Sequence, residues 1–322
     1  MHEKSRGEKI LFGFFMLFLL TGASSAMVSE EEWNKTFGGP NGDAATSVQQ
    51  TKDGGYIIAG ITDFTQTSMG YLWLLKTDSD GKEEWSKKYK KDCLALAVQQ
   101  TKDKGYILIG ILYPSDGVLL KTVLLKTDAD GNEEWSKVFE DSIAFSVQQT
   151  SNGGYIIAGR NAWLLKTDSN GNEEWNKTFG GYGDGALSIK QTSDGGYIIV
   201  GITSSYAKHG TDIWLIKTDS NGNEEWNKTF GDFGESEYEG AFSVQQTSDG
   251  GYIITGYCQP KDRNVVLLKT DSSGNMEWFR TFGGSEYDVG STVQQTSDGG
   301  FLIAGVTESF GTGRSGYLIF CL

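Results

Sequence analysis

The sequence is poor in the residues on which many catalytic sites depend. It contains only two histidines, His2 and His209, which argues against enzymes built on a histidine pair or a His-rich metal site. Its three cysteines, Cys93, Cys258 and Cys321, are too few and too odd in number for a disulfide framework. Proline occurs three times and glycine 44 times, so tight turns rather than Pro-rich linkers connect the elements.

Basic residues are also scarce. The chain has 28 Lys and Arg against 42 Asp and Glu, a formal net charge of −14. A nucleic-acid binder needs a basic face to meet phosphates, so this class is disfavoured. The 38% of hydrophobic and 22% of charged residues fit neither a membrane bundle nor a disordered chain. A length of 322 residues allows one large β-domain or two ordinary domains.

The longest apolar run lies near the N-terminus, at residues 10–20, and is ILFGFFMLFLL. Lys4, Arg6 and Lys9 precede it, and small residues follow as far as Ala26. This order is typical of a secretory signal, and the run is shorter than the about 20 residues of a spanning helix. We therefore expect a signal peptide at 1–26 and a secreted or cell-surface protein without a membrane span after cleavage. Retention of the segment as an anchor is left open.

The remainder of the chain is one repeat. The phrase EEW, or MEW in the last copy, recurs every 40 to 52 residues and ends at Trp33, Trp85, Trp135, Trp175, Trp226 and Trp278. Within each period the segments SVQQT, GGYIIAG, WLLKTD and EEWNKTFGG follow one another. Each is short, rich in β-branched and aromatic residues, and bounded by Asp-Gly or Asn-Gly turn signals, which predicts four strands per repeat and essentially no helix.

The apolar pattern of the repeat predicts the architecture. YIIAG and WLLK are apolar at successive positions, so both faces of these strands should be buried. Radial stacking of four-stranded blades buries both faces and leaves only short edges. The chain begins with a fourth strand at 31–37 and ends with three strands of a repeat. We therefore predict an all-β, six-bladed β-propeller of four-stranded antiparallel blades, with the N-terminal strand closing the last blade, as a single domain over 31–322.

The string DGGYIIAG…WLLKTDSNGNEEWNKTFGG resembles the repeat of secreted bacterial and archaeal β-propeller proteins. The resemblance covers residues 31–322 in six copies and implies the fold, since most members of that group have no assigned function. A more distant resemblance to quinoprotein-like and WD-like propellers departs from the quinoprotein spacing, because Asp168, Gly171 and Trp175 lie one residue too close. The same turn is out of register with the Asp-box of sialidase-like propellers.

Comparison of the repeats separates two rims. The turns TSDGGY and TDSNGN are nearly constant and should share one rim, whereas the two other connections vary and should share the opposite rim. Variable loops on a rigid scaffold commonly carry binding sites. The variable loops combine aromatic residues with carboxylates and glycine, which suits stacking on sugar rings or docking of a protein. The tyrosines that we select as candidate ligand-binding residues are Tyr71, Tyr113, Tyr206, Tyr238 and Tyr257. Ordinary sequence drift of loops without a ligand is the alternative.

Four basic residues complete the candidate set. Arg160, Arg263 and Arg314 fall in links between second and third strands, where convergence would suit a carboxylate ligand, as in sialidase-like enzymes. Lys190 replaces the first glutamine of SVQQT in the fourth repeat and is a candidate anion or ligand port in a channel lined by glutamines. Unrelated surface charges and a solvated channel lining are the simpler interpretations.

No cofactor is implied, although calcium is a candidate ligand. The turns at 78–81 and 128–131 begin like calcium loops but lack the further oxygen ligands and terminal Glu of a complete loop. Asn-Lys-Thr occurs at Asn34, Asn176 and Asn227, which makes these residues glycosylation candidates in an exported chain.

The sequence favours an exported, non-catalytic and monomeric propeller. It would bind a surface carbohydrate or a protein partner through the variable rim. A glycan-acting, sialidase-like hydrolase and a structural surface-layer component are the alternatives. The scarcity of histidine and the absence of a Ser or Cys nucleophile motif make an enzyme the less favoured hypothesis.

Overall fold

A computed structural model describes residues 34–114, 119–140, 142–231, 233, 238–259, 263–310 and 316–321. All regular secondary structure in these residues is β-strand, and the strands form five four-stranded sheets and one three-stranded sheet. Within every sheet each strand pairs antiparallel with the next strand in sequence. This meander follows from the short turns that the sequence predicts.

The first three sheets contain strands β1 to β12. Their bounds are β1 (Gly42–Gln50), β2 (Tyr56–Phe64), β3 (Tyr71–Thr77) and β4 (Glu83–Lys91); β5 (Cys93–Gln100), β6 (Tyr106–Leu112), β7 (Lys121–Thr127) and β8 (Glu133–Phe139); and β9 (Ala144–Gln149), β10 (Tyr155–Gly159), β11 (Trp163–Thr167) and β12 (Glu173–Thr178).

The last three sheets contain strands β13 to β23. Their bounds are β13 (Gly185–Gln191), β14 (Tyr197–Thr203), β15 (Asp212–Thr218) and β16 (Glu224–Phe230); β17 (Glu239–Gln246), β18 (Tyr252–Cys258), β19 (Asn264–Thr270) and β20 (Met276–Phe282); and β21 (Asp288–Gln295), β22 (Phe301–Thr307) and β23 (Gly316–Cys321).

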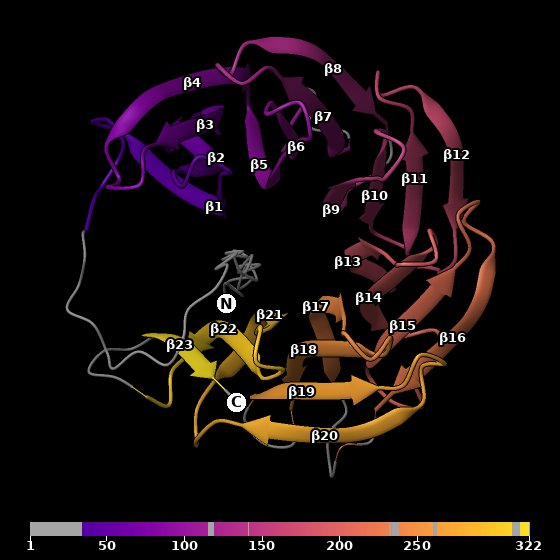
Figure 1. The fold of residues 1–322 in the computed structure, drawn as a ribbon. Helices are drawn as coiled ribbons and strands as arrows, with labels where there is room; N and C mark the ends of the chain where they lie inside the picture. Colours follow the sequence, from indigo (N-terminus) through magenta and orange to yellow (C-terminus); the bar gives the residue numbers. More distant parts are fainter. Residues whose placement is uncertain are drawn as a thin grey trace, which may run out of the picture.

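The six sheets follow one another around a common centre (Figure 1). The SVQQ strands, such as β5 and β13, lie innermost, and the EEW strands, such as β8 and β16, form the circumference. This arrangement confirms the predicted all-β propeller of six sheets. It also places the turns between first and second strands, and those between third and fourth strands where a fourth strand is present, on one rim, and the remaining connections on the other.

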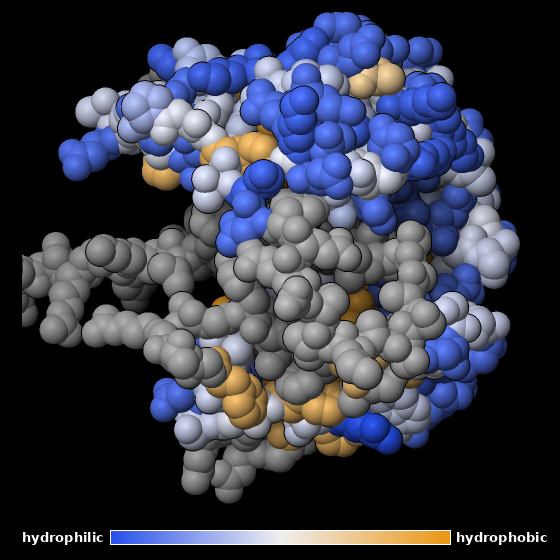
Figure 2. Space-filling model, turned by 60° about the vertical axis from the view of Figure 1, so that its left-hand side comes forward, coloured by the Kyte–Doolittle hydropathy of each residue, from blue (hydrophilic) through white to orange (hydrophobic). Residues whose placement is uncertain are grey.

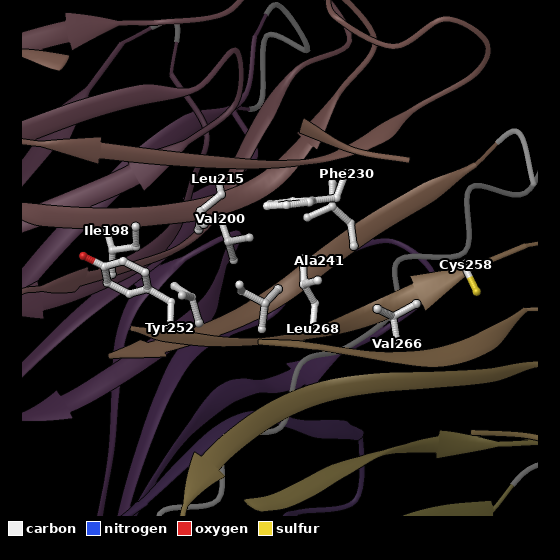
Figure 3. Packing of buried hydrophobic residues seen from close by; sticks show 12 residues of the cluster. Ile198, Val200, Leu215, Phe230, Ala241, Tyr252, Cys258, Val266 and Leu268 are labelled. Atoms are coloured by element: carbon white, nitrogen blue, oxygen red, sulfur yellow. The ribbon is translucent and has the colours of Figure 1, made fainter. Parts of the chain in front are cut away.

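Apolar side chains fill the space between consecutive sheets. Between the fourth and fifth sheets, Val200 and Leu215 pack with Ala241 and Leu268, all essentially without exposed surface (Figure 3). Similar clusters lie at the four other junctions from the first sheet to the last. Residues of YII and WLL are therefore covered on both faces, which explains their unbroken apolar runs.

The repeated tryptophan of the outer strand belongs to the same junctions. Trp175 lies edge-on against Tyr197 of the following sheet, with ring centroids 6.0 Å apart and planes at 62°. The same pairing recurs for Trp85, Trp135, Trp226 and Trp278 with the aromatic residue that opens the second strand of the next sheet. Packing between sheets therefore accounts for this tryptophan.

The predicted closing strand is not formed in the described residues. Asn34 to Phe37 lie outside any strand, and the last sheet ends at β23 with three strands. The five apolar clusters join the first sheet to the last in sequence, and no such cluster joins the last sheet to the first in these residues. Closure would join the two most distant parts of the chain, the contact with the largest loop-closure cost.

The described residues therefore leave two sheet faces without a packed neighbour. Ala45 of the first sheet is exposed, whereas Ala95, at the same position of the second sheet, is buried. On the last sheet Leu302 and Ala304 are partly exposed, whereas the matching Ile57 and Ala59 are buried. Figure 2, turned toward the open side of the ring, shows hydrophobic residues at both edges of the opening. The predicted signal peptide at 1–26 lies outside the described residues.

Candidate functional site

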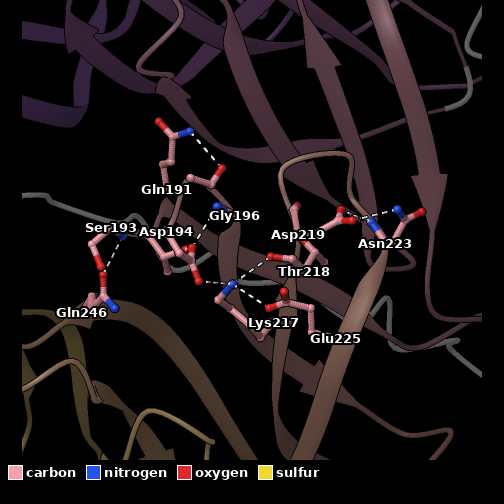
Figure 4. Close-up of polar contacts among 12 residues, drawn as sticks. Gln191, Ser193, Asp194, Gly196, Lys217, Thr218, Asp219, Asn223, Glu225 and Gln246 are labelled. Atoms are coloured by element: carbon pink, nitrogen blue, oxygen red, sulfur yellow. Dashed lines mark hydrogen bonds and ion pairs between the residues drawn. The ribbon is translucent and has the colours of Figure 1, made fainter.

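The constant rim is held together by a buried lysine in each of the first five sheets. Lys217 Nζ lies 2.9 Å from Asp194 Oδ2 and 2.8 Å from Glu225 Oε2, and donates a hydrogen bond to the Thr218 carbonyl (Figure 4). The carboxylate of Asp194 also accepts hydrogen bonds from Thr192 Oγ1 and the Gly196 N–H. One lysine thus ties the 1–2 turn, the third strand and the fourth strand of its sheet.

The electrostatics of this contact favour the charged forms. Burial raises the pKa of Asp194, but the hydrogen bonds from Thr192, Lys217 and Gly196 outweigh it and lower the pKa to about 2. Burial likewise lowers the pKa of Lys217, but Glu225 and Asp194 outweigh it and raise the pKa. The equivalent lysines of the other sheets that bind both an Asp and a Glu are Lys76, Lys126 and Lys269. The constancy of this rim therefore has a structural cause.

The acidic turns that begin like calcium loops are also internally satisfied. Asp128 Oδ1 accepts from the N–H groups of Asp130 and Asn132 at 3.0 and 2.7 Å, and Oδ2 accepts from Asn132 Nδ2 at 2.8 Å. Asp78 accepts from the N–H groups of Asp80 and Lys82 in the same way. Among the described residues no group of three His, Cys, Asp or Glu could hold a metal ion. Calcium binding stays a prediction.

Buried aspartates anchor the variable rim. Asp184 is 3% exposed, and its carboxylate accepts from Thr203, from Ser205 and from the N–H groups of Gly181 and Ser204. Asp288 accepts from Ser309 and the Gly284 N–H in the matching loops of the last sheet. Each aspartate joins the loop that enters its sheet to the link between second and third strands. These carboxylates are therefore used to hold the loops together. The aromatic side chains of the rim are the groups that are left to contact a ligand.

A cluster of aromatic side chains on this rim surrounds Arg263. Its guanidinium lies 4.3 Å from the ring centroid of Tyr257 and 5.0 Å from that of Tyr287, and Nη1 donates to Tyr287 Oη at 2.8 Å. Tyr257 is buried beneath it, whereas Tyr287 and the nearby loop residue Tyr238 are 38% and 48% exposed. The arginine side chain therefore holds together aromatic rings of the fifth and sixth sheets.

The other candidate tyrosines occupy different surroundings. Tyr206 is 56% exposed and lies 5.3 Å from the ring of Trp214, in the fourth sheet. Tyr71 and Tyr113 are partly buried in the first and second sheets, and burial raises the pKa of Tyr113. The exposed candidate tyrosines, Tyr206 and Tyr238, therefore lie on the fourth and fifth sheets.

The structure does not bring the described arginines into one contact. The Arg160 guanidinium lies 5.6 Å from the ring centroid of Tyr182, in the loop that enters the fourth sheet. Arg160 also borders a hollow of about 320 Å³ together with Leu119 and Asn161. Arg263, by contrast, contacts tyrosines of the fifth and sixth sheets. Arg314 lies outside the described residues. Arg160 and Arg263 are thus engaged by different tyrosines.

A cavity of about 100 Å³ lies at the centre of the ring and is lined by all six innermost strands. Gln49, Gln99 and Lys190 border it, as expected for a channel lined by the SVQQ strands. The sequence did not predict its apolar lining, which comes from the extra residue of a β-bulge before the Ser or Ala of this segment. These residues are Leu96, Phe145, Leu187 and Phe242. In the sequence, the only sign of this bulge is a break of one residue in the alternation of inward-facing and outward-facing positions along the strand.

Two of the glycosylation candidates have a structural contact. Asn176 Oδ1 accepts from Trp163 Nε1 at 2.8 Å, and Asn227 Oδ1 accepts from Trp214 Nε1 at 3.5 Å. Ser86 plays the same part for Trp73. Asn34 and Asn176 are exposed, and Asn227 is partly exposed. Glycosylation of the three asparagines stays a prediction.

The fold defines the chain as a β-propeller repeat protein. It is similar to a crystal structure of a protein of unknown function from Bacteroides caccae, with TM-score 0.53 and 15% identity over 78% of this chain and 86% of that one. It is also similar to the WD40 propeller domain of Doa1, with TM-score 0.56 and 10% identity over 81% and 75%. A third similar structure is Sqt1 from Chaetomium thermophilum, with TM-score 0.52 and 10% identity over 83% and 81%.

These likenesses show the fold alone. No protein-family model matches the sequence, nor does any curated protein sequence. Across the described ranges, no helix has the length and apolarity needed to cross a membrane.

Proposed function

We propose that the protein is a non-catalytic binding scaffold that holds a protein partner on the variable rim of its fourth to sixth sheets. The observation that carries the proposal is the Arg263 cluster, in which a guanidinium stacks against Tyr257 and Tyr287. Tyrosine, tryptophan and arginine dominate the binding energy of protein interfaces. Exposed Tyr206, Tyr238 and Phe310 extend the same kind of surface.

The chemistry of the rim supports binding rather than catalysis. Its aspartates Asp184 and Asp288 are engaged by loop hydroxyl and N–H groups, so their carboxylates have structural partners. Arg160 and Arg263 stack on different tyrosines, so a carboxylate clamp of converging arginines receives no support from the described residues. The glycan-acting hydrolase is therefore not the function that the geometry favours.

A protein partner is preferred to a carbohydrate because the rim aromatics are spread over neighbouring loops. Stacked tyrosines offer large contact area with little loss of side-chain entropy on binding. The basic, apolar and small residues of 1–26 support export, so the partner would be met outside the cytoplasm. A surface carbohydrate remains the other ligand to test.

The test compares rim variants with a control on the circumference. The triple variant Tyr206→Ala, Tyr238→Ala and Tyr287→Ala removes exposed rings of the rim, and Met276→Ala removes an exposed side chain of the outer strand β20. Immobilised wild-type and variant proteins are probed with a panel of purified extracellular proteins and with a glycan array. We expect a bound protein that the triple variant loses and Met276→Ala retains. Retention of all binding by the triple variant, or binding of glycans alone, would contradict the proposal.

A further inference from the structure

The innermost strands are linked by a repeated glutamine contact. In four of the SVQQ segments, the side chain of the first glutamine accepts a hydrogen bond from the backbone N–H of the second glutamine position of the next sheet. These bonds run from Gln100 to Gln49, from Gln149 to Gln99, from Gln191 to Gln148 and from Gln295 to Gln245, at 2.6 to 2.7 Å. A side-chain oxygen thus satisfies one backbone donor at each of these junctions.

The junction between the fourth and fifth sheets breaks the pattern. Lys190 stands where the other sheets have the glutamine, and an ammonium group can donate but cannot accept a hydrogen bond. The N–H of Gln246, which takes the place of Gln100 or Gln295, therefore receives no acceptor from Lys190. The Lys190 side chain forms no hydrogen bond or ion pair with the described residues. At this junction the Lys190 ammonium and the Gln246 N–H, both hydrogen-bond donors, stand at the positions that hold an acceptor and a donor at the other four junctions.

The surroundings of Lys190 contain no compensating charge. The lysine borders the central cavity with Ser188, Ser243 and the aromatic ring of Phe242. It is the only charged residue among those that line the cavity in the described chain. Burial alone lowers the pKa of Lys190, because no carboxylate contributes. In a chain of net charge −14, this cation without a carboxylate contrasts with the buried lysines of the constant rim.

We propose that Lys190 and the backbone N–H of Gln246 form a binding site for a small oxyanion at the centre of the ring. The oxyanion would supply the acceptor oxygen that a glutamine supplies at the other junctions. Hydrogen bonds from a charged donor to an anion are shorter and stronger than neutral ones. A cavity of about 100 Å³ accommodates an ion of the size of phosphate or acetate, since a water molecule occupies about 30 Å³. The site is separate from the variable rim and does not depend on the function proposed for it.

The test uses the full-length protein with phosphate and acetate alone as probes. The amide signal of Gln246 is followed by NMR while either anion is titrated at constant ionic strength. Lys190→Gln restores the glutamine of the other sheets, and Lys190→Met removes the charge without adding an acceptor. Lys52→Gln, at an exposed turn residue of the first sheet, is the control for the loss of one positive charge.

We expect a saturable shift of the Gln246 signal in the wild type and in Lys52→Gln. Both Lys190 variants should weaken binding by about tenfold or more, since they remove the charged donor. Lys190→Gln should also protect the Gln246 amide from hydrogen exchange without any added anion. Equal responses in wild type and Lys190→Met, or no saturable response of the wild type to either ion at millimolar concentration, would overturn the proposal. A response to acetate but not phosphate would assign the site to carboxylates.

Discussion

Individual lysines have opposite roles on the constant rim and at the centre of the molecule. Lys217 is 4% exposed, yet its ammonium contacts two carboxylates and a carbonyl, so the cost of burying the charge is offset. Lys190 replaces a glutamine acceptor and has no such partners among the described residues. Residue type alone does not distinguish a structural lysine from a candidate ligand-binding lysine. The difference lies in the carboxylates that adjacent turns and strands supply.

The first prediction concerns the ion pair of Asp194. The third sheet carries Asn152 at the position of Asp194, and its turn still forms the bond from Thr150 Oγ1, at 2.6 Å. Asp194→Asn should therefore keep the turn but lose the ion pair with Lys217. Because the pKa of Asp194 is about 2 in the folded protein and about 3.8 when unfolded, its charge stabilises the fold above about pH 4.

Urea unfolding of Asp194→Asn at several pH values measures this effect. With allowance for the solvent exposure of Asp194, we expect a loss of about 1 kcal/mol in the free energy of unfolding at pH 7. The difference from wild type should shrink as the pH falls from 4 to 2, since Asp194 binds its proton over this range in the unfolded chain and begins to bind it in the folded protein near pH 2. A difference that does not change over this range would show that the ion pair does not cause it.

Strand pairs are joined by turns whose glycines serve two purposes. Gly222, in the turn between β15 and β16, has φ of +71°, and a Cβ there would lie 2.7 Å from Cη2 of Trp175 in the preceding sheet. Gly195, in the turn between β13 and β14, has φ of +86° with nothing within 4 Å of such a Cβ. Gly222 is thus required both by its left-handed backbone conformation and by its contact with Trp175, whereas Gly195 is required by its backbone conformation alone.

The second prediction compares alanine at these two turns. Gly195→Ala should lower the free energy of unfolding by about 1–2 kcal/mol, the cost of a left-handed backbone at a residue with Cβ. Gly222→Ala should cost more, by about 1–3 kcal/mol in addition, because the methyl group displaces the Trp175 ring. Chemical denaturation of both variants gives the difference. Equal losses would mean that the outer tryptophans adjust freely, contrary to their packing role.

At the scale of the whole molecule, one junction out of six lacks its contacts in the described residues. The Oε1 atom of Gln294 is buried without a hydrogen-bond partner, whereas the matching atom of Gln245 accepts from Gln295. In the repeated pattern the missing donor would be the Gln50 N–H of the first sheet. The orphaned oxygen and the uncovered face around Ala45 therefore lie where a closed ring would need them.

The third prediction tests closure through the outer tryptophan. If residues 31–37 form the fourth strand of the last sheet, Trp33 packs on Tyr56 as Trp175 packs on Tyr197. Trp33→Ala should then lower the free energy of unfolding by about 3 kcal/mol, as should Trp175→Ala. Urea titration of the two variants provides the comparison. A loss for Trp175→Ala without any for Trp33→Ala would mean that the ends of the ring do not meet through this strand.

Much of the fold could be predicted because every repeat carries the same local signals. The Asp-Gly turn at 194–195 and the apolar run at 197–200 determine a hairpin and a two-sided core, and six close variants of this hairpin leave few alternatives to a propeller. The candidate site was less predictable because it depends on contacts between repeats. Nothing in the sequence indicates that Arg263 lies between Tyr257 and Tyr287, or that Asp184 is occupied by loop hydroxyl groups.

The uniform chemistry of the junctions has a consequence for the history of such chains. Each outer tryptophan of the described residues meets the aromatic residue that opens the second strand of the next sheet, so the sheets on either side of an inserted or deleted repeat would still meet through the same kind of contact. Unequal recombination between gene segments could thus alter the circumference of the ring without demanding compensating substitutions. Only positions at which the repeats differ in sequence, such as Lys190, would then distinguish one repeat from another.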